Sequence, residues 1–489
     1  MKGDFSRLTF NMNKHFRRVL MQQGRVQLDA DWNEQTAILL HHMEALTKDL
    51  FGEHSGPADI EDNDKNVLRR NLGFEIIVDS ERIDQFSELT AGHKQELKSL
   101  LNQKPAIIIG KGHYYIDGIL CEIDKDLPFS QQPDYPWPKD TDLENGTYLI
   151  YADVWERHIT YIEDDSIREV ALGGPDTATR SQLVWQVKTE KNLPNSTDLI
   201  PRTYVNDADI KSWIEWVDKY WSAWKNQWQP ANRGLLKAQA KQDPKKDTAP
   251  CIISAEASYR STENQLYRVE IHNPGKAGNA TFKWSRDNGS VVTGAKLSGT
   301  ELTVDNPRGF IVGLWVELTN DNQELRGERG ALAKIINIDG DVLSLGPINI
   351  AVPSGEQKPT KARLWESDEI AVQESNSDND WIKLADGVQI QFQPNPENQY
   401  RTGDYWLIPA RVATGDVEWP GAVGKPEALP PFGIEHHYAP LAIVTINEKP
   451  AVTDLRQHIG PLVSHYSQPA AFTAPPKAVK ATAPATRKP

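Results

Sequence analysis

Carboxylates are the most frequent residues in this chain that could do chemistry. Glu163 to Asp165, Asp176 and Asp287 lie in segments rich in turn-forming residues. Glycoside hydrolysis uses two carboxyl groups on either side of the bond that breaks. These acids are therefore candidates for a polysaccharide hydrolase or lyase, but acid-rich turns are also common in proteins without such activity.

Adjacent histidines are the next candidates. His436 and His437 follow one another, and neighbouring residues of a strand point to opposite faces of a sheet. The two imidazoles are therefore poorly placed to hold one zinc ion, even with Asp404 and Glu418 as companions. Neither Cys121 nor Cys251 has another cysteine or a histidine nearby in the sequence at the spacing typical of a zinc site.

Short catalytic signatures are absent from the sequence. It contains no GxSxG elbow, phosphate-binding loop, dinucleotide-binding fingerprint or HExxH motif. The two cysteines cannot form a disulfide framework, and we expect both to be buried free thiols. The sequence therefore predicts no cofactor, no metal site and no enzyme activity.

Length and charge restrict the remaining classes of function. A chain of 489 residues is expected to fold as two to four packed units. Its net charge of −14 argues against nucleic acid as a partner. We find no signal peptide and no stretch long enough to span a membrane, which argues against direct membrane insertion. We expect the protein to be made in the cytoplasm and to act as part of a particle, including outside the cell after release.

The most specific local pattern lies at the front of the chain, in "RVLMQQGRVQLDADWNEQ" (residues 18–35). Residues 19–21 and 25–28 are predicted as two short strands. Gly24 supplies the turn between them. This pattern indicates a hairpin that leads directly into a helix.

The helix after this hairpin is predicted to begin with Asp31 as its N-cap and to end at Phe51, before Gly52. Its apolar residues recur at spacings of three and four. The helix could pack on its own domain or dock on a partner subunit. The second alternative predicts these interface residues: Trp32, Leu39, Leu40, Met43 and Leu46.

A second apolar helix is predicted at residues 209–229, with tryptophans along one face. It could cover a neighbouring sheet or form a patch between subunits. The residues expected at such a patch are Trp213, Trp216, Tyr220 and Trp224.

The remaining pattern is of short strands with glycine-containing turns, so the predicted fold is mainly β with inserted helices (α+β). Several small antiparallel modules are expected, including a barrel or sandwich near residues 296–365. The predicted units are 1–73 (attachment hairpin and helix), 74–250 (β domain with the tryptophan-rich helix), 251–365 (hairpins and barrel), 366–463 (a β module) and 464–489 (an Ala/Pro-rich tail expected to be disordered).

Four blocks of the chain together resemble one uncharacterised bacterial domain family. They are "MQQGRVQLDADWNEQ", "ALGGPDTATR", "FKWSRDNGSV" and "GDYWLIPAR", and the resemblance extends to about Val463. It implies no enzyme activity and no site residues. It implies a part of a phage-tail-like particle, such as a contractile injection system.

Three functions follow from these patterns. The first is a structural or assembly component of such a particle, at its baseplate, spike or fibre, with other subunits or further copies of itself as partners. The second is a glycan-binding adhesin that uses an exposed tryptophan such as Trp137 on a surface glycan. The third is a polysaccharide hydrolase or lyase that uses Asp165 or Asp287.

Overall fold

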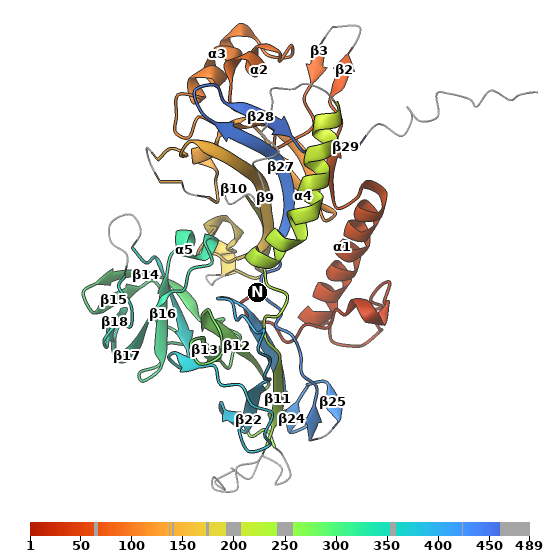
Figure 1. Ribbon diagram of the computed structural model, residues 1–489. Helices are drawn as coiled ribbons and strands as arrows, with labels where there is room; N and C mark the ends of the chain where they lie inside the picture. Colours follow the sequence, from red (N-terminus) through yellow and green to blue (C-terminus); the bar gives the residue numbers. More distant parts are fainter. Residues whose placement is uncertain are drawn as a thin grey trace, which may run out of the picture.

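The computed structural model describes residues 1–62, 67–135, 137–138, 141–172, 176–191, 207–241, 258–352, 358–422 and 424–459. The fold is mainly β with a few helices, as the sequence predicts. Figure 1 shows an upper body, a lower body to which a barrel is joined, and helix α1 (Asp29–Phe51) along one edge.

The upper body is organised around one long antiparallel sheet. Its strands are, in order, β10 (Arg180–Glu190), β9 (Gly146–Ile159), β27 (His437–Ile446) and β28 (Ala451–Asp454). Strands β9 and β27 are almost 300 residues apart in the sequence and pair along most of their length. Side chains alternate between the faces of a strand, so Ile150 and Leu149 of β9 enter two different buried clusters. Both faces of this sheet are therefore covered.

Helix α4 (Asp207–Trp228) covers one face of this sheet. Smaller elements cover the other face. They are the sheet of β29 (His458–Ile459), β1 (His54–Pro57), β6 (Gly112–Ile116) and β7 (Ile119–Ile123) and the sheet of β4 (Ile76–Ile77), β5 (Ile108–Ile109) and β8 (Leu127–Pro128). Helices α2 (Ser80–Asp84) and α3 (Ala91–Leu100) pack on the far side of the second of these small sheets.

The lower body is a sandwich of two sheets that share one apolar core. In the first sheet the order is β20 (Ile370–Ala371), β13 (Thr281–Ser285), β12 (Gln265–Asn273), β23 (Tyr405–Arg411) and β24 (Asp416–Val417). In the second it is β11 (Leu236–Ala240), β22 (Val388–Phe392) and β21 (Ile382–Lys383). Two short hairpins, β2 (Ile60–Asp62) with β3 (Val67–Arg69) and β25 (Gly421–Ala422) with β26 (Lys425–Pro426), lie outside these layers.

A closed barrel adjoins the lower body, as expected for residues 296–365. Its strands are, in order, β14 (Val292–Ser298), β15 (Glu301–Val304), β18 (Val342–Leu345), β17 (Ala331–Asp339), β16 (Trp315–Thr319) and β19 (Lys361–Trp365), and α5 (Asp321–Leu325) follows β16. Apolar side chains fill its interior. The barrel is therefore a packed core, which is typical of a small closed sheet.

The larger sheets that contain strands of the predicted unit 366–463 also contain strands of other predicted units. Strands of this unit join partners from other predicted units: β27 pairs with β9, β23 with β12 and β22 with β11. The tail predicted at 464–489 lies outside the described residues. Among the helices that the structure describes, none is long and apolar enough to cross a membrane.

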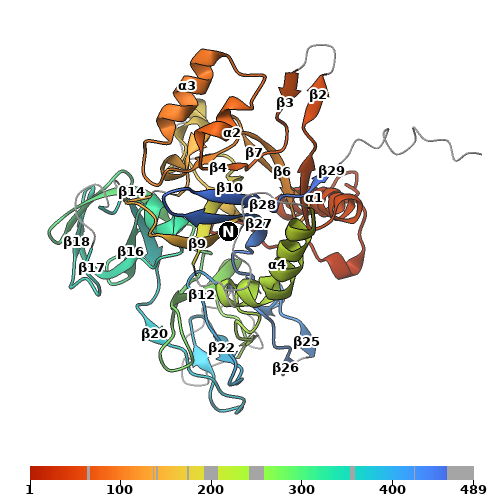
Figure 2. The ribbon, with the colours of Figure 1, turned by 45° about the horizontal axis from the view of Figure 1, so that its top comes forward.

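The first residues of the chain lie between the upper and lower bodies in both ribbon views (Figures 1 and 2). Lys2 Nζ lies 3.0 Å from a carboxylate oxygen of the buried Glu270 on β12. The Asn288 side chain donates a hydrogen bond of 2.9 Å to the carbonyl of Gly3. The front of the chain is therefore fixed to the lower body before it reaches α1.

Candidate protein-interaction surface

The prediction of a hairpin at residues 19–28 is wrong. Among residues 15–28, all of which are described, the structure forms no strand and keeps only the turn at Gln23–Gly24, where Gly24 has a φ of +72°. A short strand needs a paired edge to be stable. This backbone instead attaches to α1, where the N–H of Val19 donates to Oε1 of Gln35 at 2.9 Å.

Helix α1 also begins differently from the prediction. Asp31 is not the N-cap, because the helix begins at Asp29 and Leu28 occupies the cap position without a side-chain hydrogen bond. Oδ2 of Asp29 accepts a hydrogen bond of 2.9 Å from the backbone N–H of Ser6. A residue 23 positions earlier in the chain therefore fixes the start of the helix.

The inner face of α1 packs against the chain's own residues. Ala30 and Ile38 are the buried residues of this helix, with about 1–2% of their surface exposed. The hydroxyl of Thr9 donates to Oε2 of Glu34 at 2.5 Å. The extended residues before the helix therefore run along it and hold its first half.

The second half of α1 is anchored to the β6–β7 turn. Lys48 Nζ lies 2.9 Å from Oδ1 of Asp117, and Nδ1 of His437 lies 2.9 Å from Oδ2. Burial raises the pKa of Asp117, but the hydrogen bonds from His437 and Lys48 outweigh this effect and bring the pKa to about 2. A Cβ on Gly118 would lie 2.2 Å from the carbonyl oxygen of Glu44, so only glycine permits this close approach.

The end of α1 is as predicted. The helix stops at Phe51, and the N–H of Gly52 donates to the carbonyl of Lys48. Gly52 has a φ of +85°, a conformation that favours glycine. The Phe51 ring lies 6.4 Å from the ring of Tyr115 on β6. Both ends of α1 are therefore fixed to the upper body and to the front segment.

The outer face of α1 carries apolar side chains that the described residues leave exposed. Trp32 is 78% exposed and Met43 is 65% exposed. All five residues predicted as an interface on this helix are exposed, and Leu50 joins them. We define the outer face of α1 by these residues: Trp32, Leu39, Leu40, Met43, Leu46 and Leu50.

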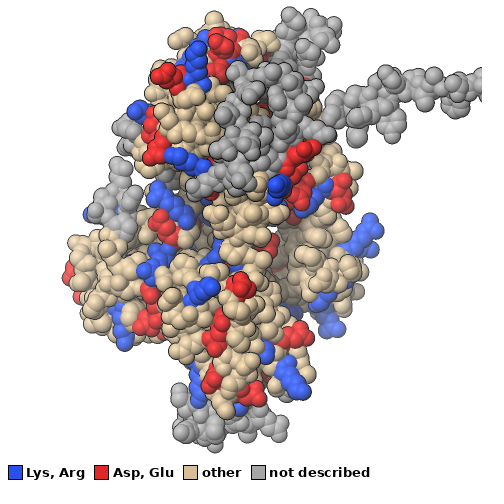
Figure 3. Space-filling model, viewed as in Figure 1, with Lys and Arg blue, Asp and Glu red and all other residues tan. Residues whose placement is uncertain are grey.

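Exposed apolar side chains are concentrated at this end of the molecule. Fifteen of the 25 exposed large hydrophobic residues among those described lie within residues 1–50. Space-filling atoms in Figure 3 show intermixed charges over most of the visible face and a largely uncharged stretch at α1. Apolar surface gathered in this way typically marks a protein–protein contact. The exposed residues of the preceding segment include Met12, Phe16, Leu20, Met21 and Val26.

Helix α4, the second predicted patch, packs its tryptophans on the long sheet of its own subunit. Trp221 and Trp224 are buried against Leu149, Tyr151 and Ile443 of the long sheet. The half-buried Tyr220 packs on the same cluster. Trp224 is therefore not available to a partner, and the interface predicted at this residue is wrong. The side chains of Trp213 and Trp216 lie outside the described part of the chain.

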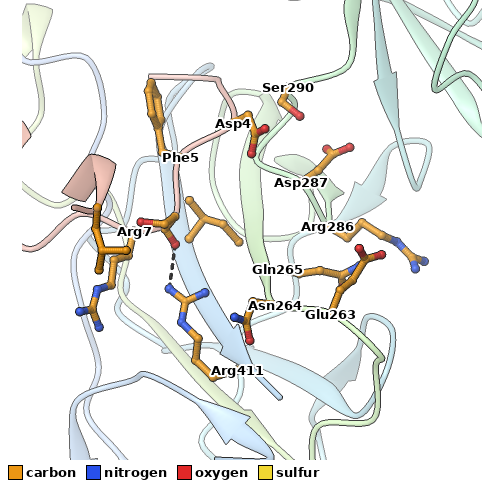
Figure 4. Close-up of a pocket in the computed structure, with 13 residues that line it drawn as sticks. Asp4, Phe5, Arg7, Glu263, Asn264, Gln265, Arg286, Asp287, Ser290 and Arg411 are labelled. Carbon is orange, nitrogen blue, oxygen red and sulfur yellow. Dashed lines mark hydrogen bonds between the residues drawn. The ribbon is translucent and has the colours of Figure 1, made fainter. Parts of the chain in front are cut away.

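Asp287 lines a pocket of about 580 Å³ between the front segment, the start of β12 and the β13–β14 turn. Asp4, Asp287 and Ser290 lie at one end of this pocket and Arg411 at the other (Figure 4). The Ser285 hydroxyl donates to Asp287, which is the turn hydrogen bond typical of an aspartate in this position. Nη2 of Arg411 donates to the carbonyl of Ser6 at 2.7 Å, so this arginine holds the front segment.

The other candidate carboxylates are held separately. An oxygen of Asp165 pairs with Arg168 at 2.8 Å, and Oδ2 of Asp176 accepts a hydrogen bond from the N–H of Tyr161 at 2.8 Å. Neither acid lines the pocket of Asp287. The structure therefore assigns turn-stabilising contacts to these acids and does not place Asp165 with Asp287 across a common substrate.

Glu163 belongs to a group of three carboxylates, together with Asp321 and Glu324 of α5, that are close enough to share a cation. Lys361 already supplies one, because its Nζ lies 2.6–2.7 Å from an oxygen of each acid. Burial raises the pKa of Glu324, but the charge of Lys361 outweighs it and lowers the pKa to about 2. The cluster is therefore an internal ion-pair network that joins the upper body to the barrel.

The adjacent histidines point to different partners, as strand geometry predicts. Nδ1 of His436 lies 2.6 Å from the buried Asp153, whereas His437 contacts Asp117. The proposed companions are engaged elsewhere: Asp404 with Arg233 at 2.8 Å, and Glu418 with Arg7 at 3.1 Å. These four residues therefore do not form a common metal site. Cys121 is buried and free, and burial raises the pKa of its thiol to about 12; Cys251 lies outside the described residues.

Comparison with known families decides where this chain belongs. The sequence model of DUF6519, a family of unknown function, matches residues 1–61, 80–200 and 227–452. The chain belongs to the DUF6519 family. No curated protein and no solved structure matches it.

The matched ranges distinguish the two apolar helices of this DUF6519 protein. All of α1 and the front segment lie within residues 1–61, whereas nearly all of α4 lies in the gap between 200 and 227. Sequence reasoning identified the outer face of α1 from its spacing. It missed the residues that hold the helix, such as Asp117 and His437, because they lie far away in the sequence.

Proposed function

We propose that this chain is a structural subunit of a phage-tail-like particle and that residues 8–51 attach it to a neighbouring subunit. The observation that carries this proposal is the outer face of α1: a row of exposed apolar side chains on a helix whose other side is held by residues of the same chain. The family resemblance of the sequence supplies the class of particle.

The physical basis is the cost of leaving this face in water. Burial of one large apolar side chain contributes roughly 1.5–3 kcal/mol. Because α1 is already folded and fixed at both ends, a partner that covers it does not have to order the helix. A rigid apolar face of this kind is suited to stable assembly in which the partner stays bound.

Point substitutions on the outer face test this proposal better than removal of residues 1–51. Such a truncation would also remove Lys2 and Gly3, which contact Glu270 and Asn288 of the lower body. We expect Met43→Glu to leave the fold intact and to abolish incorporation into particles pelleted from cells that carry the variant. Ile336→Glu, at a residue of β17 that is 55% exposed, is the matched control and should be incorporated normally. Normal incorporation of Met43→Glu would refute the proposal.

The two alternatives gain no support from the residues that the sequence offered for them. Trp137, the tryptophan suggested for glycan binding, is half-buried, lies 5.1 Å from the ring of Phe129 and donates its Nε1–H to the carbonyl of Thr141. Asp165 and Asp287 make turn contacts and are not brought together. We therefore propose only the assembly role.

A further inference from the structure

The exposed side chains of α1 follow the repeat of a coiled coil. Successive members are separated by four, three, four, three and four residues, which is the spacing of the a and d positions of a heptad. At 100° per residue they fall within an arc of about 80°. We call this set the seam; it consists of Trp32, Thr36, Leu39, Met43, Leu46 and Leu50.

Every residue of the seam is exposed. Thr36 fits the apolar row because its hydroxyl donates to the carbonyl of Trp32 at 3.3 Å, which leaves its methyl group for contact. The buried Ala30 and Ile38 lie on the opposite side of the helix. α1 therefore has two apolar faces, one used within the chain and one arranged for a second helix.

We propose that the seam binds the same seam of a second copy of this chain, antiparallel and about a two-fold axis near His41. This inference rests on the proposed function and names the partner of the same surface. In this register Trp32 meets the partner's Leu50, Thr36 meets the partner's Leu46, and Leu39 meets the partner's Met43. Each layer then pairs a larger side chain with a smaller one or two of similar size.

A parallel pair would fit less well. It would place Trp32 against the partner's Trp32 and Thr36 against the partner's Thr36, so the distance between the helices would have to change along the seam. Antiparallel helices also bring the positive end of each helix dipole near the negative end of the other. Both considerations favour the antiparallel arrangement.

The positions beside the seam also favour a second copy. In an antiparallel pair the e positions face each other, which brings Leu40 against the partner's Leu40 at the axis. Leu40 is 44% exposed and would extend the apolar contact there. Of the flanking residues only Asp49 carries a formal charge, and it would face the partner's Gln35. Like charges therefore do not meet at this contact, although each chain carries a net charge of −14.

The seam is long enough for a weak but specific dimer. From Trp32 to Leu50 it extends about 27 Å at 1.5 Å per residue. Covering six side chains on each copy removes on the order of 1,000 Å² from water, near the lower limit for a specific interface. α1 lies at the edge of the molecule in both ribbon views, where a second body can approach (Figures 1 and 2). We expect a Kd on the order of 10 µM.

Sedimentation velocity of the full chain between 1 and 100 µM tests this dimer. We expect the sedimentation coefficient to rise from monomer to dimer over this range. Met43→Glu should raise the Kd at least about 30-fold, because each copy would bury a charge in the central layer. Ile336→Glu should leave the Kd unchanged, and circular dichroism checks that both variants fold. A chain that stays monomeric at 100 µM, or a dimer that Met43→Glu leaves intact, would overturn the inference.

Cross-linking with a short bismaleimide tests the orientation in a Cys251→Ser background, where Cys121 is buried. Leu40→Cys should cross-link to the same residue of a second copy. Leu50→Cys should not, because the antiparallel register places residue 50 of one copy about 27 Å from residue 50 of the other. The reverse result would overturn the antiparallel pairing.

The same variants separate this inference from the proposed function. A monomeric chain whose Met43→Glu variant is excluded from particles would refute the second copy as partner and support the attachment role. A chain that dimerises through the seam, but whose Met43→Glu variant is incorporated normally, would support the second copy as partner and refute the attachment role.

Discussion

Helices α1 and α4 are similar in length and in apolar content, but the structure uses them in opposite ways. α4 places Trp221 and Trp224 on the sheet of β9 and β27, and they are buried there. α1 buries only Ala30 and Ile38 and leaves the row from Trp32 to Leu50 exposed. A row of apolar residues on a helix therefore predicts a contact and does not say whether the contact lies within one subunit or between two.

The difference lies in what each helix meets. α4 lies on a sheet whose Tyr151 ring stacks on Trp228 at 3.9 Å. One face of the helix therefore places Trp221, Trp224 and Trp228 on this sheet. α1 touches the body mainly through polar anchors, such as the pairs of Lys48 with Asp117 and Asp29 with Ser6. Polar anchors fix the position of a helix without covering its apolar residues.

The largest effect is expected from matched tryptophan substitutions in the two helices. Trp224→Ala removes a buried ring and should lower the free energy of unfolding by about 3–5 kcal/mol. Trp32→Ala should change it by less than about 0.5 kcal/mol in the monomer. Urea unfolding followed by far-UV circular dichroism measures both. An equal loss of unfolding free energy in the two variants would contradict the claim that Trp224 is buried and Trp32 is exposed.

Neighbouring residues of α1 give the next test, because they lie on opposite faces. Ile38→Ala should destabilise the packing of α1 by about 2–4 kcal/mol, whereas Leu39→Ala should have little effect on the monomer. Hydrogen exchange of the α1 amides reports this difference locally. Faster exchange in the Leu39 variant than in the Ile38 variant would contradict the assignment of the faces.

A smaller, pH-dependent effect is expected at the anchor of α1. The pKa of Asp117 is about 2 in the folded protein and close to 3.9 in an unfolded chain. Its contribution to stability is therefore fully present above about pH 4 and is lost as the pH falls towards 2. Asp117→Asn should cost about 1 kcal/mol at pH 7, and its difference from the wild type should shrink below pH 4. A difference that stays constant down to pH 2.5 would argue against this ion pair.

The smallest effect on stability is expected on the outer face itself. Leu46→Gln should change the free energy of unfolding by less than about 0.5 kcal/mol, because Leu46 has few contacts to lose. The same change should reduce the binding of an apolar dye such as ANS to the monomer. Unchanged dye binding would indicate that the dye finds its apolar surface elsewhere.

The sequence predicted those parts of the fold that depend on local pattern. The end of α1 at Gly52 and the barrel at 296–365 follow from spacing and turn residues close together in the chain. The start of α1 could not be predicted, because Ser6 supplies the hydrogen bond to Asp29. The pairing of β9 with β27 joins residues nearly 300 positions apart and leaves no local trace.

For the candidate surface, too, local pattern predicted some features, and others depend on residues far apart in the sequence. Trp32 and Met43 were predicted as interface residues from their spacing, and the structure leaves them exposed. Trp224 has an equally clear pattern and is buried, because the sheet that covers it is assembled from distant strands. Burial of a helix face is thus a tertiary property that periodicity alone does not predict.

Radical footprinting with mass spectrometry tests the central claim most directly, by comparing the isolated monomer with the protein in its assembled state. The account predicts that Trp32 and Met43 are oxidised rapidly in the monomer and become protected on assembly. The buried Trp224 should stay unreactive in both states, and Phe432, which is 49% exposed, should stay reactive in both. Equal oxidation of Trp32 and Met43 in the two states would contradict the claim that the outer face of α1 is where this protein is held.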